Sequence, residues 1–478
     1  MTRPLWTSDD MELATGGTAT APFTVTGTVS IDTRTLEEGD LFVALKDVRD
    51  GHDFAEAAFK AGAAGALVSR KVGDGPQLVV EDVLTALEQL GIAARARCGA
   101  HRTAITGSVG KTSVKEMLAR IYRALGPAHW SQKSFNNHWG VPLTLARMPE
   151  DTERAVFEIG MSTPGEIAPR SHMVRPHTGI ITRIAGAHLE GLGSLEAVAR
   201  EKADIFAGLE AGGTFILPAD DDFFDLLADR ARAYCPTGNL ESFGRSPEAT
   251  ARIVGYETDG MVSRIQVDVV GKPVLVVIKA VGEHWAQNVA AALLAASLSG
   301  ASVEDCAEAL NGYAPPPGRG TSETLALPGG GEFTLIDDAY NANPASMRAA
   351  LAALKQRGSG RRLVALGEML EIGDTSDAEH SGLAVPVVES GAAGAFLAGD
   401  KMTHLAEALP PEFQKVWAPR ADGLFEAVEN ALRDGDVLLI KGSNASGMGK
   451  LADRLRQWSA PANMGKMVRS AEGAAGVG

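Results

Sequence analysis

The segment 104–113, Ala-Ile-Thr-Gly-Ser-Val-Gly-Lys-Thr-Ser, restricts the fold of this chain more than any other. An apolar run leads into Gly107 and Gly110, and Lys111 then opens a helical pattern. Glycines let backbone N–H groups approach an anion without an intervening Cβ, and the N-terminus of the new helix adds the positive end of its dipole. The segment therefore predicts a phosphate-binding loop between a strand and a helix. The alternative is a glycine turn that caps an ordinary helix.

The loop matches the compact pattern T-G-x-x-G-K-T, because Ile105 stands where the longer P-loop template has glycine. In such a loop the lysine, here Lys111, reaches the outer phosphates of a nucleotide, and the hydroxyl of Thr112 ligates Mg²⁺. The loop residues expected to surround the nucleotide are Thr106, Gly107, Ser108, Gly110, Lys111, Thr112 and Ser113.

Length and charge limit the remaining possibilities. A chain of 478 residues with 45% apolar residues is long enough for about three domains, each with its own core. The net charge of −15 argues against binding to nucleic acid or to an anionic membrane surface. The three cysteines form no metal-binding or disulfide pattern, and no apolar run approaches the ~18 residues of a membrane span. We therefore expect a cytoplasmic, soluble protein.

The hydrophobic pattern predicts an α/β protein with three domains. Short β-type runs and alanine-rich helices alternate up to residue 98, longer βαβ units follow, and the proline-rich stretch 315–318 precedes a second open α/β pattern. The predicted division is a small α/β domain over 1–98, a central parallel-sheet domain of the P-loop ATPase type over 99–317, a Rossmann-like domain over 318–460, and a mobile tail over 461–478. The predicted strands are 23–31, 40–45, 66–68, 78–80, 155–159, 178–184, 214–217, 251–256, 263–278, 333–336, 363–366, 395–398 and 437–440, and one predicted helix is 195–209.

Polar residues follow several of these apolar runs, at the strand ends where open α/β sheets bind ligands. Glu158 ends one run, His188 follows the next, and Lys202 lies on the helix after it. Alone, each has an ordinary interpretation: an exposed glutamate, a structural histidine and a solvated lysine. Their placement after successive strands of one sheet favours a shared site near the phosphate loop.

Two further groups occur beyond the phosphate loop. Asn288 lies in an alanine-rich helix, where it could contact a base or simply pack. Asp337 and Asp338 follow a strand, and Arg319 comes just after the linker. Two adjacent carboxylates held together would need a cation or sugar hydroxyls as partners.

The chain carries, in this order, T-G-S-V-G-K-T at 106–112, F-N-N-H-W-G-V-P at 135–142, F-E-I-G at 157–160, A-H-L-E-G at 187–191, E-K-A-D-I-F at 201–206, G-R at 318–319 and D-D-A-Y-N-A-N-P at 337–344. It also carries I-D-T-R at 31–34, G-D-L-F-V-A-L-K at 39–46 and G-H-D-F at 51–54 before them, and L-G-E-M-L-E-I-G at 366–373 and K-G-S at 441–443 after them. With these strings the sequence resembles the Mur ligase family over essentially the whole chain. The string Y-N-A-N-P at 340–344 is the most specific, and it is similar to the members that add D-alanyl-D-alanine.

The resemblance implies an ATP-dependent amide ligase that adds D-alanyl-D-alanine to a UDP-N-acetylmuramoyl tripeptide through an acyl phosphate, in peptidoglycan precursor synthesis. It implies two Mg²⁺ ions, one held by Thr112 and Glu158 and one by His188 and a carbamylated Lys202, with Lys111 as the phosphate-binding catalytic lysine.

The same resemblance implies which residues of each domain contact the substrates. Asn137, Asn288, Arg319 and Asp338 are expected to contact ATP; Thr33, Arg34, Lys46 and His52 the UDP-muramoyl peptide; and Tyr340, Asn341 and Asn343 the substrates at the third domain. A monomer is expected. The alternatives are a folylpolyglutamate synthase, which lacks the first-domain strings, and a catalytically silent nucleotide-binding module, which would not need the second-metal pair.

Overall fold

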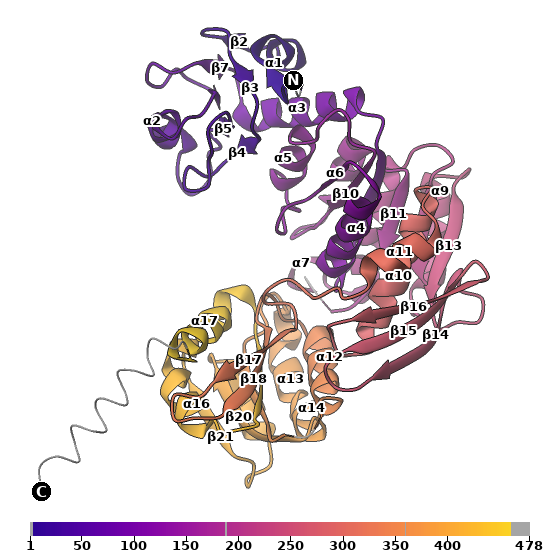
Figure 1. Ribbon diagram of the computed structural model, residues 1–478, viewed down its shortest axis with the longest axis vertical. Helices are drawn as coiled ribbons and strands as arrows, with labels where there is room; N and C mark the ends of the chain where they lie inside the picture. Colours follow the sequence, from indigo (N-terminus) through magenta and orange to yellow (C-terminus); the bar gives the residue numbers. More distant parts are fainter. Residues whose placement is uncertain (1–2, 187–188, 359, 460–478) are drawn as a thin grey trace, which may run out of the picture.

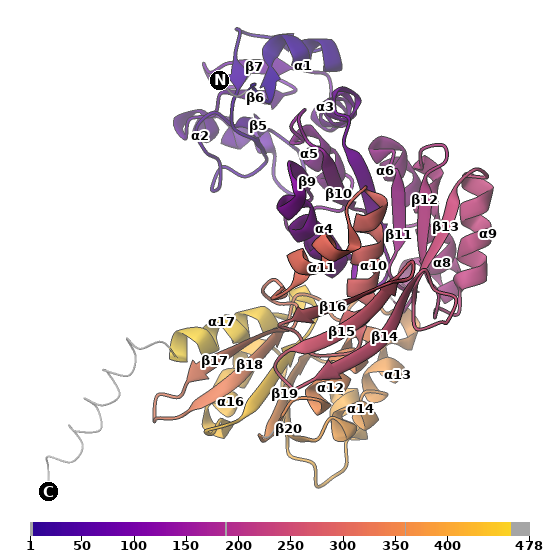
Figure 2. The same ribbon diagram turned by 45° about the vertical axis from the view of Figure 1, so that its right-hand side comes forward.

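The computed structural model describes residues 3–186, 189–358 and 360–459, and for residues 189 and 190 it describes only the backbone. His188 and the tail predicted over 461–478 therefore lie outside the described residues. The chain forms three α/β domains in sequence order, seen as indigo, purple-to-red and orange-to-yellow regions in Figure 1. In both views the second domain lies between the first and the third (Figure 2). Within the described residues, no helix is long and apolar enough to cross a bilayer.

The first domain is built on a five-stranded sheet of order β2-β7-β6-β5-β4, in which only the β2–β7 pair is antiparallel. Its elements are β1 (Trp6–Thr7), α1 (Ser8–Thr15), β2 (Thr18–Ala19), β3 (Thr24–Val25), β4 (Val29–Ser30), β5 (Leu41–Val43), α2 (Ala55–Lys60), β6 (Gly65–Val68), β7 (Gln77–Val79) and α3 (Val83–Arg97). The single strand predicted over 23–31 is wrong. The chain bends at Thr26 and Gly27, whose N–H groups both donate to the carbonyl of Gly39, so two short strands form instead.

The core of the first domain extends beyond its own residues. Leu143 and Ala146 of α5 (Gly140–Ala146), in the second domain, belong to the same buried cluster as the apolar face of α3. The Trp6 indole N–H donates to the Ala146 carbonyl at 2.8 Å, and Arg147 Nε donates to the Val29 carbonyl at 2.6 Å. Burial of apolar surface together with these bonds fixes the first domain against the second.

The second domain contains a nine-stranded sheet of order β16-β15-β14-β13-β12-β11-β8-β10-β9. The strands between β14 and β9 in this order, which include β8, all pair in parallel. Strands β14, β15 and β16 form an antiparallel extension. The strands are β8 (His101–Thr106), β9 (Ala128–Trp130), β10 (Arg154–Glu158), β11 (Thr178–Ile181), β12 (Thr214–Pro218), β13 (Asn239–Gly244), β14 (Ala251–Thr258), β15 (Ser263–Val269) and β16 (Lys272–Ile278).

Helices cover both faces of this sheet. One face packs α4 and α10 in a large buried cluster, and the other packs α5, α6, α8 and α9. The helices are α4 (Lys111–Leu125), α6 (Ile167–Val174), α7 (Leu189–Leu192), α8 (Leu195–Ala203), α9 (Phe224–Tyr234), α10 (His284–Leu298) and α11 (Val303–Leu310). After β8 the chain adds β9 and β10 on one side of that strand and β11 on the other, so the strand order reverses at β8. Such a switch point is where open α/β sheets bind ligands.

The third domain has a six-stranded sheet of order β17-β18-β22-β19-β20-β21, parallel except for the β17–β18 pair. Its elements are β17 (Thr321–Ala326), β18 (Glu332–Asp338), α12 (Pro344–Lys355), β19 (Arg362–Gly367), α13 (Ser376–Ser381), α14 (Ala384–Glu389), β20 (Ala392–Ala398), α15 (Met402–Ala408), β21 (Lys415–Ala418), α16 (Phe425–Ala431), β22 (Val437–Lys441) and α17 (Met448–Ser459).

Two further predicted elements differ from the structure. The helix predicted over 195–209 is α-helical only to Ala203 and continues as a 3₁₀ turn from Asp204 to Gly208. The run 263–278 is a hairpin, because the chain reverses at Val270 and Gly271, which both have positive φ. Strands β1, β2, β9, β13, β17 and β21 are absent from the prediction, since their sequences are short or polar.

Candidate active site

The phosphate loop lies between β8 and α4, and its two glycines are required by close contacts. A Cβ on Gly107, whose φ is +147°, would lie 2.0 Å from Thr182 Oγ1. A Cβ on Gly110, whose φ is +88°, would lie 2.7 Å from Asn288 Oδ1. The loop is fixed to the end of β11, because the Ser108 N–H donates to the Arg183 carbonyl at 2.8 Å and the Thr182 hydroxyl donates to Val109. Only glycine fits these positions without displacing β11 or α10.

Lys111 opens α4 and its ammonium group donates to the carbonyl of Gly107 at 2.6 Å. Burial lowers the pKa of Lys111, while the Glu158 carboxylate acts against this shift and Arg319 adds to it. The lysine is thus held within the loop at the start of the helix, where an anion would meet it together with the helix dipole.

Thr112 and Glu158 meet at the mouth of the loop. The Thr112 hydroxyl donates to Glu158 Oε2 at 2.8 Å, and the Asn136 amide donates to Glu158 Oε1 at 2.8 Å. Glu158 is 1% exposed, and its backbone N–H donates to Ser131 Oγ at 3.1 Å. A buried carboxylate beside a hydroxyl supplies the hard oxygen ligands that Mg²⁺ prefers. The residues present therefore fit one Mg²⁺ ion.

Lys202 is 1% exposed and lies on α8. Burial, followed by the charge of nearby Lys111, lowers its pKa well below the ordinary value, and Glu201 opposes the shift. A buried ammonium group with a second ammonium group nearby is unfavourable, so the environment favours the uncharged form of Lys202. His188, the second residue predicted for this position, lies outside the described residues.

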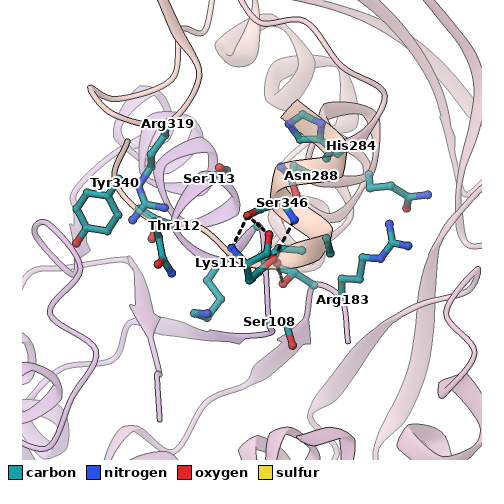
Figure 3. A pocket seen from close by; sticks show the side chains of 18 of the residues that line it. Ser108, Lys111, Thr112, Ser113, Arg183, His284, Asn288, Arg319, Tyr340 and Ser346 are labelled. Carbon is teal, nitrogen blue, oxygen red and sulfur yellow. Dashed lines mark hydrogen bonds between the residues drawn. The ribbon is translucent and has the colours of Figure 1, made fainter. Parts of the chain in front are cut away.

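A cavity of about 490 Å³ opens over the loop and is closed on its other side by the third domain. Figure 3 shows Arg319 and Tyr340 on one side of this cavity and His284 and Arg183 on the other. The Arg319 guanidinium lies 4.0 Å from the centre of the Tyr340 ring, and its Nη2 donates to Ser134 Oγ at 3.0 Å. The sequence-predicted residues that line this cavity are Ser108, Gly110, Lys111, Thr112, Ser113, Glu158, Asn288, Arg319, Asp338, Tyr340, Asn341 and Asn343.

The two adjacent aspartates are not held together as the sequence suggested. They end β18, where successive side chains point to opposite faces of the sheet. Asp338 points to the cavity and pairs with Lys441 at 2.8 Å, whereas Asp337 pairs with Arg456 of α17 at 2.7 Å. Each carboxylate therefore has its own cation, and Asp337 belongs to the interior of the third domain.

The Y-N-A-N-P string at 340–344 connects β18 to α12, with Pro344 as the first residue of the helix. Asn343 caps α12, since its side chain accepts from the Ser346 N–H at 2.9 Å. The carbonyl of Asn341 accepts from Lys441 Nζ at 2.9 Å. The string thus combines a helix cap with a loop tied to the neighbouring strand β22, which places Tyr340 and Asn341 at the cavity surface.

Three residues predicted to contact the nucleotide, Thr106, Gly107 and Asn137, are not among those that line the cavity. Thr106 is fully buried at the base of the phosphate loop, and Asn137 accepts from the Gly140 N–H at 2.9 Å at the start of α5. Among the described residues that line the cavity, the position is taken by Asn136, whose amide holds Glu158. The double asparagine gives no sign of which residue contacts Glu158, because that depends on how the loop is turned.

Several cavity residues were missed by sequence reasoning: Ser134, Asn136, Arg183, His284, Trp285 and Lys441. Burial lowers the pKa of His284 to about 4, with contributions from Lys441 and Arg183. A neutral imidazole therefore faces the cavity at neutral pH. The K-G-S string at 441–443, at the end of a predicted strand, was the only available signal for Lys441.

The four residues predicted to bind the UDP-muramoyl peptide lie in the first domain, away from this cavity. Arg34 and Lys46 are exposed, and Arg34 forms a bidentate pair with Asp32. His52 is 3% exposed; its Nδ1 lies 2.6 Å from Asp50, and its Nε2 accepts from the Ser69 N–H at 2.9 Å. Both nitrogens of His52 thus hold the fold, whereas Arg34 and Lys46 remain accessible to a ligand.

Comparison with known proteins gives matches over most of the chain. The family model described as the Mur ligase middle domain matches residues 105–296, and that described as the Mur ligase glutamate ligase domain matches residues 325–444. A UDP-N-acetylmuramoyl-tripeptide–D-alanyl-D-alanine ligase from Escherichia coli is 39% identical over 363 residues, which are 74% of this chain and 76% of that protein. The ligase of the same name from Bacillus subtilis is 34% identical over 436 residues, 88% of this chain and 91% of that protein.

Two solved structures also match most of this chain. A crystal structure of MurF from Acinetobacter baumannii has a TM-score of 0.83 and 29% identity, and the match covers 95% of this chain and 99% of that chain. A MurF structure from Thermotoga maritima in complex with ADP has a TM-score of 0.75 over 93% of this chain and 99% of that one. At 22% identity this second likeness concerns the fold alone.

Proposed function

This chain belongs to the Mur ligase family, and from that premise we propose that it joins a UDP-N-acetylmuramoyl tripeptide to D-alanyl-D-alanine, with conversion of ATP to ADP and phosphate. Curated relatives that match most of its length carry the name of that ligase. It is an ATP-dependent amide ligase of peptidoglycan synthesis.

One observation carries the assignment of the site. The cavity unites a phosphate loop in the second domain with cationic and aromatic residues of the third, so an ATP molecule on Lys111 would lie between both domains. We assign phosphate binding to the loop over 106–113 and to Lys111, and contacts with the rest of the nucleotide to Asn288, Arg319 and Asp338. We retain the domain limits 98/99 and 317/318 as part of the same proposal.

The proposed metal ligands are Thr112 and Glu158 for one Mg²⁺, and His188 with a carbamylated Lys202 for a second. The low pKa of Lys202 supports a carbamate, because the neutral amine is the form that reacts with carbon dioxide. When bound, Mg²⁺ offsets negative charge on the phosphates and on the incoming carboxylate.

In the proposed reaction, a carboxylate oxygen of the tripeptide attacks the γ-phosphorus, and the bond from that phosphorus to the bridging oxygen breaks as ADP leaves. The amine of D-alanyl-D-alanine then attacks the acyl carbon, the bond between that carbon and the oxygen bridging to phosphorus breaks, phosphate leaves with the bonding pair, and the nitrogen gives up a proton to solvent. Lys111 stabilises charge on the transferred phosphoryl group. Closure of the third domain over the second positions the amine and excludes water.

The substrate contacts follow from the position of each domain. We assign Tyr340, Asn341 and Asn343, at the edge of the third domain, to the substrates that meet ATP. For the nucleotide-sugar end we assign the first-domain residues Thr33, Arg34, Lys46 and His52, with His52 bonded to Asp50, which forms a β-bridge with Lys46. An acidic protein needs such local cations to bind a diphosphate.

The function is tested by coupled measurement of ADP release with a UDP-muramoyl tripeptide, in the presence and absence of D-alanyl-D-alanine. We expect turnover only with both substrates, and poor turnover with single D-amino acids. Equal or faster turnover with diaminopimelate or glutamate as the acceptor would assign the chain to a different ligase. ATP binding without turnover in any combination would support a silent nucleotide-binding module instead.

A further inference from the structure

One buried cation near the active site has no role in the proposed chemistry. Lys115 lies on α4 and is 0% exposed, and its side chain points away from the cavity toward the loop over 131–136. Its ammonium group donates to the carbonyls of Ser131, at 2.8 Å, and of Lys133, and pairs with Glu116 at 2.7 Å. All three N–H donors of the ammonium are therefore engaged. A buried charge is costly, so a lysine here needs a reason beyond packing.

The loop that Lys115 holds has an unfavourable backbone. Lys133 has φ of +52°, in the left-handed region that residues with a Cβ rarely adopt. Such strain persists only where the surroundings enforce it, and here the Lys133 carbonyl is an acceptor for Lys115. The turn at Lys133 directs the next residues of the loop toward the cavity.

Three side chains of this loop contact the groups around the phosphate loop. Ser131 Oγ accepts from the Glu158 N–H at 3.1 Å, and the Asn136 amide donates to Glu158 Oε1 at 2.8 Å. Ser134 Oγ accepts from Arg319 at 3.0 Å and lies 3.5 Å from Thr112 Oγ1. The loop therefore joins the proposed Mg²⁺ ligands to an arginine that belongs to the third-domain side of the cavity.

We propose that Lys115 is a positioning residue, which fixes the loop over 131–136 so that Asn136 and Ser134 orient Glu158 and Arg319 for Mg²⁺-nucleotide binding. This inference rests on the proposed function for the identity of the ligand. Lys115 itself is not among the residues that line the cavity. Outer partners that orient a metal ligand alter metal affinity or activity by about 10- to 100-fold when they are removed.

The test compares Lys115→Met with the unmodified protein. Met has similar volume but cannot donate, and Arg120→Met, an exposed cation on the same helix that donates to two carbonyls away from this loop, is the matched control. ADP binding is measured by calorimetry with saturating Mg²⁺ and again with EDTA. We expect Lys115→Met to lose about 10- to 100-fold of the enhancement by Mg²⁺, with a smaller loss of ADP binding in EDTA, because Arg319 also depends on the loop through Ser134. Amide exchange over 131–136 should also become faster without any ligand.

A second variant and a double-mutant comparison make the test independent of folding problems. Lys115→Gln retains two donors for the two carbonyls, and it should give an intermediate loss. In Lys115→Met, the further change Asn136→Ala should add little, because both act through the same contact with Glu158. A lower melting temperature with unchanged enhancement by Mg²⁺, or fully additive effects of the two changes, would overturn the proposal.

The nucleotide-binding readout separates this inference from the proposed function. Absence of ligase turnover in the unmodified protein would count against the proposed function alone. Normal turnover in the unmodified protein, combined with wild-type Mg²⁺ dependence in Lys115→Met, would count against Lys115 alone.

Discussion

The pair between Lys441 and Asp338 gives a prediction whose size and pH dependence follow from the structure. Lys441 is 2% exposed and its Nζ lies 2.8 Å from Asp338 Oδ2, so Lys441→Met leaves a carboxylate in a largely buried position. At an effective dielectric constant of about 20, two charges at this distance attract by about 6 kcal/mol before desolvation is counted. Breaking a buried pair by removing one partner typically costs about 3–5 kcal/mol.

Protonation of Asp338 limits this loss. Burial already raises the pKa of Asp338, and Lys441 and then Arg319 oppose that rise. Without Lys441 the carboxyl can take up a proton, at a cost of about 1.4 kcal/mol for each pH unit above its ordinary pKa. The cost of this protonation limits the destabilisation by Lys441→Met to about 4 kcal/mol at pH 7 and about 2 kcal/mol at pH 5. Because the pKa is raised in the folded state, the variant should regain stability as pH falls toward the ordinary pKa of 3.8.

The assay is amide exchange of β18 and β22 in the native protein between pH 5 and 8, since a three-domain chain does not unfold as one unit. Rates are corrected for the intrinsic pH dependence of exchange. Lys415→Met, at an exposed lysine on β21, is the control and should change little. Asp338→Asn added to Lys441→Met should abolish the pH dependence. An equal loss of stability in Lys441→Met at pH 5 and at pH 8 would refute the electrostatic reasoning. A loss of stability below about 1 kcal/mol would show that the pair contributes no more than a surface ion pair.

Other variants test the remaining assignments. Lys111→Ala should abolish turnover with an unchanged melting temperature, and phosphate release at the normal rate from the folded variant would contradict the phosphate-loop assignment. Glu158→Gln should raise the Mg²⁺ concentration needed for half-maximal activity by at least about 10-fold, whereas an unchanged requirement would remove Glu158 from the metal site. Lys202→Ala should lose nearly all activity and regain part of it with acetate, and an undiminished kcat would contradict the carbamate. Burial lowers the pKa of His129 to about 4. The unfolded protein therefore takes up a proton at this histidine first, and the stability of the folded protein should fall as pH drops from about 6.5 toward 4. Thermal unfolding of His129→Gln, which should lack this pH-dependent contribution, checks the sign.

Local sequence was sufficient wherever the chemistry lies within a few consecutive residues. The strand, the two glycines and Lys111 determine the phosphate loop by themselves, because backbone conformation and the helix dipole act over that short range. The apolar runs predicted the α/β class and most parallel strands for a similar reason. Runs such as β3 and β4 were merged in the prediction, because a bend enforced by Gly39 from elsewhere in the chain leaves no mark on the run itself.

Tertiary structure decided which side chains meet. Asp337 and Asp338 are neighbours in sequence but have different cations, because a strand directs successive side chains to opposite faces. Asn136 rather than Asn137 reaches Glu158, because the loop turns at Lys133 and Lys115 holds that turn. The sequence determines residue types and local conformation through short-range sterics, whereas the partners of a polar side chain depend on segments far apart in the chain that become neighbours only when the domains pack.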